Sequence, residues 1–242
     1  MFLRVINPNT TPAMTATIEE CARAVIGPGV RLEAVTPAMG PASIESHYDE
    51  ALAVPGILAE VLSGERLQVD GYVIACFGDP GLDAAREIAS GPVVGIAEAA
   101  MHAASFLGRG FSVVTTLERT AGRAWELAAR YGFAAHCKGV HACEIPVLDL
   151  ESDPSTVDRV TALAAEALSR DRSDVIVLGC AGMADLCAAV SRRIGAPVVD
   201  GVAAAVSTVA GLVRCGLRTA WSGEYALPPP KRYTGLLSAY GS

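Results

Sequence analysis

The sequence predicts an α/β protein built from two related units, each a parallel sheet covered by helices. Short apolar runs alternate with longer segments of helical period, which is typical of parallel strands joined by helices. The chain has 242 residues, of which 51% are hydrophobic and 19% charged, so it can bury a large core. It also repeats: residues 69–100 and 173–205 share the order of apolar strand, cysteine, glycine turn, helix and Pro-Val-Val strand. We therefore expect two units that face one another about a pseudo-twofold axis.

Strands are expected where short apolar runs are bounded by turn residues. They fall at residues 2–6, 31–36, 71–76, 93–96, 111–115, 140–143, 174–179 and 197–199. The first helix should begin at Pro12, because proline suits the first helical turn. A helix predicted at 48–62 contains Pro55 and Gly56, so we expect a break or kink there. Further helices are expected at 80–90, 97–107, 119–132, 156–170, 183–194 and 202–214.

The charge of the chain restricts its partners. A formal net charge of −7 argues against a nucleic-acid or anionic-membrane surface, because either needs a basic patch. The N-terminal stretch MFLRVINPNT does not have the pattern of a signal peptide. The most apolar late stretch, 198–213, contains Asp200, Ser207 and Thr208 and is too short to span a membrane. We expect a cytoplasmic protein whose partner is a small molecule.

The cysteines are numerous but do not suggest disulfides. There are seven: Cys21, Cys76, Cys137, Cys143, Cys180, Cys187 and Cys215. An odd number without any CxxC pair argues against a disulfide framework and leaves burial, metal binding or thiol catalysis. Three of them lie at apolar positions of predicted helices and are expected in the core, namely Cys21, Cys187 and Cys215.

Motifs for other chemistries are weak or absent. His136, Cys137, His141 and Cys143 could suggest a metal site, but the strand spacing places only the last two on one face. The sequence contains no GxxxxGK[ST] or GxGxxG phosphate cradle and no GxSxG elbow. We expect neither a metal nor another cofactor.

Cys76 and Cys180 occupy equivalent places in the repeat. Cys76 lies 16 residues before Pro92, and Cys180 lies 17 residues before Pro197. Each follows a predicted strand, and ligands of open α/β sheets bind at the carboxyl ends of strands. Each is followed by a glycine turn and a helix, whose positive end favours thiolate over thiol. After Cys76, Asp79 is expected to cap that helix.

Two thiols that face one another suit the inversion of a carbon acid. One thiolate removes a proton from one face of the ligand, an enolate forms, and the other thiol returns a proton to the opposite face. Backbone N–H groups of the glycine turns and the hydroxyls of Thr115 and Thr116 could stabilise the enolate oxygen.

Other interpretations remain open at this point. A cysteine at a strand end is often only a small buried hydrophobe. The chain could also be a two-lobed binding protein without chemistry, or a thiol redox enzyme whose sulfurs reach disulfide distance. His102 and Glu98 are expected to pair on a surface, whereas His47 and Glu45 could be either solvated or functional.

Seven segments carry motifs that match one known family. They are VINPNTT at 5–11, GPASIESHYDEALAVPG at 40–56, VIACFGDPGLDAAREI at 73–88, VVGIAEAAMHAAS at 93–105, FSVVTTLERT at 111–120, LGCAGMADL at 178–186 and PVVDGVAAAV at 197–206. Together they resemble the aspartate/glutamate/hydantoin racemase superfamily, and within it the hydantoin and allantoin racemase branch. The resemblance covers nearly the whole chain.

The resemblance implies a cofactor-independent racemase with Cys76 and Cys180 as acid and base. It implies two Rossmann-like units with the active site in the cleft between them, one of residues 1–96 plus about 203–242 and one of 97–202. It implies a homo-oligomer. The substrate pocket would be lined by Asn7, Ser43, Ile44, Phe77, Gly78, Thr115, Thr116, Gly179, Ala181 and Gly182.

The substrate implied is a five-membered cyclic diamide with a hydrogen at C5. We see no arginine near either cysteine that could clamp the carboxylate of aspartate or glutamate. The apolar residues Phe77, Ile44 and Met183 favour a 5-substituted hydantoin, with allantoin as the alternative.

Overall fold

The computed structural model describes residues 1–241 and contains two parallel sheets of four strands each. The first sheet has the order β2-β1-β3-β4, and the second has the order β6-β5-β7-β8. Their strands are β1 (Phe2–Ile6), β2 (Arg31–Val35), β3 (Gly71–Ile74), β4 (Val93–Gly95), β5 (Phe111–Thr115), β6 (Cys137–Ala142), β7 (Val175–Leu178) and β8 (Val198–Val199). Each predicted strand is present, and the two sheets share one strand order, as the repeat requires.

The helices connect the strands in sequence order and cover both faces of each sheet. They are α1 (Pro12–Val25), α2 (His47–Arg66), α3 (Leu82–Ile88), α4 (Ile96–Leu107), α5 (Glu118–Arg130), α6 (Thr156–Asp171), α7 (Cys187–Ile194) and α8 (Gly201–Arg214). Four short 3-10 helices are also present: η1 (Val147–Asp149) follows β6, η2 (Ala181–Leu186) follows β7, and η3 (Gly223–Tyr225) and η4 (Gly235–Tyr240) follow α8.

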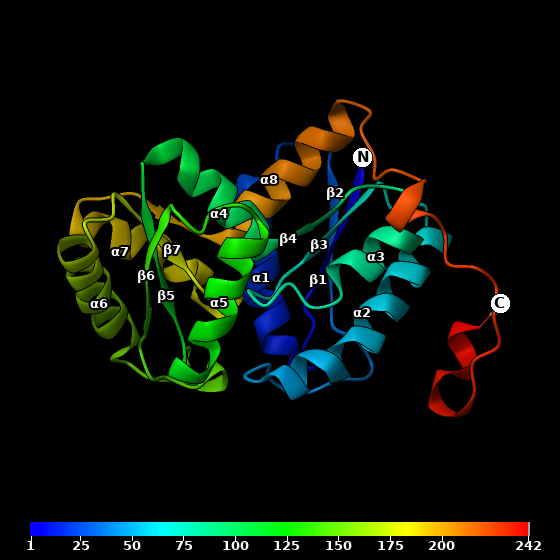
Figure 1. Ribbon diagram of the computed structural model, residues 1–242, viewed down its shortest axis with the longest axis horizontal. Coiled ribbons are helices and arrows are strands. Elements are labelled where there is room, and N and C mark those ends of the chain that lie inside the picture. The colour runs from blue at the N-terminus through cyan, green and yellow to red at the C-terminus, as the bar shows by residue number, and fades with distance from the viewer. Residues whose placement is uncertain (242) are drawn as a thin grey trace.

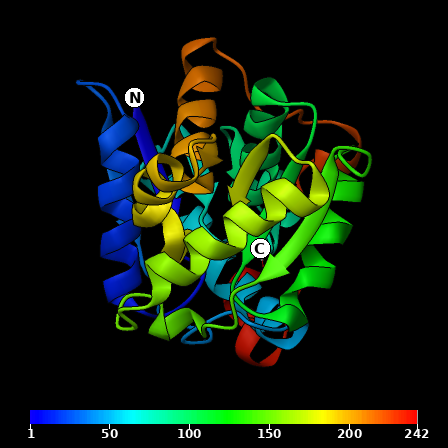
Figure 2. The ribbon, with the colours of Figure 1, turned by 90° about the vertical axis from the view of Figure 1, so that its left-hand side faces the viewer.

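Four hydrophobic clusters form, one on each sheet face, because buried parallel strands present apolar side chains to both sides. Helices α2 and α3 lie on the outer face of the first sheet, and α1 and α8 on its inner face (Figure 1). Helices α4 and α5 lie on the inner face of the second sheet, and α6 and α7 on its outer face, where α6 crosses the front of Figure 2. The predicted fold class is therefore confirmed.

Helix α2 is not broken at Pro55, so of the predicted break or kink the break does not occur. It continues for 20 residues, from His47 to Arg66. A proline removes one helical hydrogen bond, but its φ suits the helix. The buried side chains of Ala53 and Ile57, which flank it, pack against the first sheet and keep the chain helical.

The residues after α8 return along the first unit. Tyr225 donates to Asp83 of α3 at 3.2 Å, and Tyr240 donates to the carbonyl of Pro55 at 2.5 Å.

Cys215 is exposed, so its predicted place in the core is wrong: it follows the last turn of α8, where the apolar face of the helix has ended. Cys21 and Cys187 are half-buried at the edges of two clusters. None of the helices within residues 1–241 combines the length and the apolar character needed to cross a bilayer.

Candidate active site

Cys76 and Cys180 line the same cavity. Strand β3 ends at Ile74 and strand β7 ends at Leu178, so each cysteine lies two residues beyond the central strand of its sheet. Both side chains keep some accessible surface toward the cavity. The two cysteines at equivalent positions of the repeat therefore place their thiols in one pocket.

Each thiol has the same local hydrogen-bond donor, the backbone N–H two residues further along the chain. The N–H of Gly78 donates to the sulfur of Cys76, and the N–H of Gly182 donates to the sulfur of Cys180. Each bond lowers the pKa of its thiol, but burial outweighs it. Burial raises the pKa of Cys180 to about 12 and raises that of Cys76 further. The glycine turns thus favour the thiolate, but desolvation of the charged form dominates, so the pKa of each thiol is raised overall.

Most of the residues predicted for the pocket come together. Seven of them line the cavity with the two cysteines: Ile44, Phe77, Gly78, Thr115, Thr116, Gly179 and Ala181. Thr115 ends β5, and its hydroxyl donates to the carbonyl of Gly179 at 3.3 Å, which ties the β5 end to the turn of Cys180.

Three predicted residues lie behind the cavity wall or beside it. Asn7 is fully buried, and its amide donates to Asn9 and Thr15, each at 2.9 Å. Asn9 itself lines the cavity, so Asn7 supports the wall from the second layer. Ser43 is half-buried outside the lining, and Gly182 is buried behind Cys180.

Charged residues that the sequence analysis missed also reach the cavity. Glu50 of α2 and both Arg119 and Arg123 of α5 line it, together with His47. The statement that no arginine lies near the cysteines is therefore wrong. The two arginines are four residues apart at the start of a helix that follows Thr116, and this spacing is the signal that could have placed them on one face.

Another correction concerns the apolar part of the pocket. Met183 is fully buried and lies outside the lining, so it contributes nothing to the choice of substituent. Met14 of α1 and Val147 of η1 line the cavity instead. They come from segments 31 or more residues away from either cysteine turn, which no local motif could indicate.

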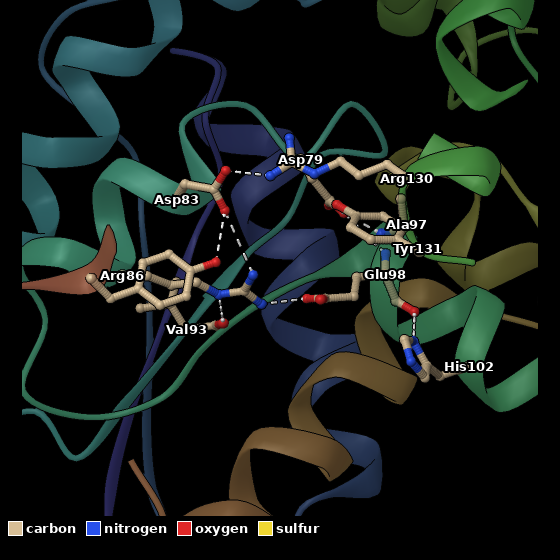
Figure 3. Close-up of polar contacts among 10 residues, drawn as sticks. Asp79, Asp83, Arg86, Val93, Ala97, Glu98, His102, Arg130 and Tyr131 are labelled. Atoms are coloured by element: carbon tan, nitrogen blue, oxygen red, sulfur yellow. Dashed lines mark hydrogen bonds and ion pairs between the residues drawn. The ribbon is translucent and has the colours of Figure 1, made fainter. Parts of the chain in front are cut away.

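Asp79 does not cap α3, whose N-cap is Gly81. Its carboxylate instead accepts from the N–H groups of Ala97 and Glu98, at 3.1 and 2.9 Å, at the start of α4 (Figure 3). The hydroxyl of Tyr131, at the end of α5, donates to the same carboxylate at 2.7 Å. Burial raises the pKa of Asp79 to about 7. The turn of Cys76 is thereby fastened to the helices that cover the second sheet.

The remaining titratable clusters do not form a metal site. Within residues 1–241, no group of three or more His, Cys, Asp and Glu side chains could hold a metal ion. His141 pairs with Asp171 at 2.6 Å behind the second sheet. The expected side-chain pair of His102 and Glu98 does not form: His102 contacts the backbone carbonyl of Glu98, whose carboxylate binds Arg86 at 2.5 Å (Figure 3).

Comparisons with known proteins agree with this geometry. A family model described as Asp/Glu/Hydantoin racemase matches residues 3–209. The chain is 43% identical over 242 residues to the hydantoin racemase of Pseudomonas sp. (strain NS671), with 100% of this chain and 97% of that protein covered. It is 46% identical over 236 residues to the hydantoin racemase of Rhizobium meliloti, covering 97% and 98%.

Solved structures extend the similarity to three dimensions. The allantoin racemase from Klebsiella pneumoniae superposes with a TM-score of 0.97 at 48% identity, covering 100% of this chain and 99% of that one. The allantoin racemase from Pseudomonas fluorescens superposes with a TM-score of 0.93 at 39% identity, covering 97% and 100%.

Proposed function

Since this chain belongs to the Asp/Glu/Hydantoin racemase family and is a racemase, we propose that it inverts C5 of 5-substituted hydantoins with Cys76 and Cys180 as the acid and base. Residues 1–96 with about 203–242 would form the unit that carries Cys76, and residues 97–202 the unit that carries Cys180. The observation that carries the proposal is that two cysteines from equivalent turns line one cavity.

The reaction needs one thiolate and one thiol at the same time. The thiolate removes the C5 proton, the ring flattens into an enolate, and the opposite thiol protonates C5 from the other face. A raised pKa makes each thiolate, once formed, a stronger base toward a weakly acidic C–H bond. After one turnover the roles of Cys76 and Cys180 are exchanged, so the enzyme acts on both enantiomers.

The enolate oxygen needs hydrogen-bond donors. We assign this role to backbone N–H groups of the cysteine turns and to the hydroxyl of Thr116, which lie at the cavity. Removal of one such donor commonly lowers kcat by about 10²- to 10³-fold. The hydroxyl of Thr115 also lies at the cavity, but it donates to the carbonyl of Gly179 and cannot donate to the enolate at the same time.

Allantoin is a second candidate substrate, supported by the polarity of the pocket. Its ureido substituent carries donors and a carbonyl oxygen, and the polar side chains of Ser46, His47 and Arg119 lie in the lining. The similarity to two allantoin racemases points the same way. Phe77, Ile44 and Met14 supply the apolar surface that an alkyl hydantoin would use.

We also propose a homo-oligomer that works in a reducing compartment such as the cytoplasm. Large apolar side chains are exposed on α4 and in the C-terminal segment, Phe106 by 84% and Leu236 by 99%, which supports contact with further copies. All seven cysteines are free, which supports the compartment. Light scattering of the purified protein measures the number of subunits.

Hydrogen exchange at C5 tests the two-cysteine proposal. Each enantiomer of a 5-alkylhydantoin is incubated in D2O with the wild type, Cys76→Ala or Cys180→Ala, and both C5 deuteration and optical rotation are followed. We expect both variants to lose racemisation by at least about 10²- to 10⁴-fold, the usual contribution of an acid or base. Each variant should keep exchange for one enantiomer only, because one face of the ring retains its thiol.

Controls separate this result from loss of structure and from spontaneous racemisation. Cys215→Ala removes an exposed cysteine outside the cavity and should behave as the wild type. An enzyme-free sample measures the spontaneous exchange. Full racemisation by either site variant would contradict the assignment. Parallel rates with allantoin give the ratio of kcat/KM for the two substrates, which decides between them.

A further inference from the structure

An ion pair contacts the turn of Cys76, and both of its side chains line the cavity. Arg123 of α5 donates from Nη2 to the carbonyl of Gly78 at 2.9 Å and from Nε at 3.3 Å. The same Nε lies 3.4 Å from a carboxylate oxygen of Glu50 of α2. Helices that cover different sheets therefore meet on the backbone two residues after Cys76.

Glu50 is packed directly on this turn. A Cβ atom on Gly78 would overlap a carboxylate oxygen of Glu50, so a larger residue there would displace that side chain. The side chains of Glu50 and Arg123 are 18% and 25% exposed, so solvent screens the pair only in part. The N–H of Gly78 is the group that bonds to the sulfur of Cys76. The pair thus holds the residue that orients the thiol.

Among the described residues 1–241, no ion pair contacts the turn of Cys180 in this way. A Cβ atom on Gly182 would meet the apolar ends of Leu150 and Met14, at 3.1 and 3.6 Å, and the sulfur of Cys180 at 3.7 Å. The charge that acts on Cys180 is the carboxylate of Glu45, which raises its pKa together with Cys143 and accepts from the N–H of Val147 at 2.8 Å. The first cysteine turn is therefore bordered by a carboxylate paired with a guanidinium, and the second by hydrocarbon and a carboxylate without such a pair.

We propose that Glu50 and Arg123 are positioning residues for Cys76: they fix its turn from two helices that cover different sheets and make its electrostatic surroundings different from those of Cys180. This inference rests on the proposed role of Cys76 as acid and base. It adds a reason why two thiols with the same local turn need not ionise alike.

The charges around the thiol determine the sign of each effect. Groups facing Cys76 that raise its pKa are Glu50, Asp79 and Cys180, and groups that face Glu50 are Arg123, His47 and Glu126. Removal of the Glu50 charge should lower the pKa of Cys76. Removal of Arg123 should raise it, because Glu50 is still ionised at the alkaline pH where thiols titrate and then lacks its cation.

Alkylation by iodoacetamide measures this difference without any substrate. Only the thiolate reacts, and mass spectrometry of the digested protein gives separate rates for the peptides of Cys76 and Cys180. A pKa change of about one unit alters the thiolate fraction tenfold below the pKa, and the altered nucleophilicity offsets part of it. We therefore expect the Cys76/Cys180 rate ratio to rise about threefold in Glu50→Gln and to fall about threefold in Arg123→Gln.

Two further variants provide matched controls. Glu126→Gln removes the other carboxylate that pairs with Arg123, at 3.5 Å, but this residue is 64% exposed and does not touch the turn, so the ratio should be unchanged. Arg123→Lys keeps the charge and should keep the ratio, while its single ammonium group cannot replace the two-nitrogen contact and kcat should fall.

The outcomes separate this proposal from the racemase mechanism. An unchanged ratio in Glu50→Gln, or equal changes at both cysteines, would overturn the positioning role even if racemisation by the wild type is confirmed. A changed ratio would support it even if the D2O experiment removed the two-base assignment. If Arg123→Gln lacks the near-ultraviolet circular dichroism of the wild type, its side chains are no longer packed normally, and the Cys76/Cys180 rate ratio of Glu50→Gln alone tests the proposal.

Discussion

The two halves of the molecule cap equivalent helices in different ways. In the second half Asp200 is the N-cap of α8, and its carboxylate accepts from the N–H groups of Val202 and Ala203, both at 2.9 Å. In the first half Gly95 stands at the matching position after the Pro-Val-Val strand. The carboxylate that accepts the equivalent two N–H groups of α4 comes from Asp79.

The difference shows that the first N–H groups of a helix can find their carboxylate acceptor at the N-cap residue itself or on a residue from another turn. A Cβ atom on Gly95 would overlap the carboxylate of Asp79, so the side chain from the cysteine turn occupies the space that a local cap would use. The residue that matches Asp79 in the second half is Met183, which is fully buried. Only in the first half does the cap connect the cysteine turn to a helix that covers the other sheet.

Replacement of each capping aspartate by alanine should give the largest difference in stability between the two halves. Asp79→Ala leaves one buried and two part-buried donors without their acceptor, so we expect a loss of about 3 kcal/mol in the free energy of unfolding. Asp200→Ala removes a local cap, and we expect a loss of about 1 to 2 kcal/mol. Urea unfolding measures both, and racemase activity should fall only in Asp79→Ala. Equal losses in stability and activity would contradict the comparison.

The pH dependence of stability should also differ between the two caps. Burial raises the pKa of Asp79 to about 7, so between pH 5 and 8 the folded protein binds more protons at this site than the unfolded chain does. Stability contributed here is present at low pH and is lost as the pH rises through 7. We expect Asp79→Asn to remove on the order of 2 kcal/mol of this decrease.

Asp200 supplies the matched control for this measurement. Burial also raises the pKa of Asp200, but by less than that of Asp79. Asp200→Asn should therefore change the pH dependence of urea unfolding less than Asp79→Asn does. If both variants retain the full wild-type decrease between pH 5 and 8, neither carboxylate is its source.

Transfer of the local cap to the first half should have the smallest effect. Gly95 has φ −86° and ψ 149°, which any residue can adopt, whereas Asp79 has φ 45°, a value that favours glycine. Gly95→Asp alone should destabilise the protein because its side chain overlaps Asp79. Adding Asp79→Gly should restore about 1 kcal/mol through a local cap. Thermal unfolding of the single and double variants checks this; no recovery in the double variant would show that the positions are not interchangeable.

Much of the fold could be predicted because it depends on local patterns. The bounds of the strand at Phe111–Thr115 and the start of the first helix at Pro12 agree with the prediction, since an apolar run and a proline mark them directly. The uninterrupted helix around Pro55 was not predicted, because packing of its neighbours against the sheet overrides a local preference.

The candidate site divides in the same way. The equivalence of Cys76 and Cys180 is visible as a repeat, and the structure brings both to one cavity. The contact from Arg123 to the carbonyl of Gly78 joins residues 45 positions apart, and no periodicity of the sequence encodes it. Sequence distance is the reason that the charged wall of the pocket was missed.

The succession of strands and helices, the duplication and the equivalence of the two cysteines follow from the amino-acid order alone, because each depends on apolar periodicity or on residues that lie close together along the chain. Which side chain caps α4, which ion pair borders Cys76 and how far burial opposes ionisation of the thiols follow from the folded structure. Those properties depend on the distance between atoms in space and on the exclusion of water, and both exist only once the chain has folded.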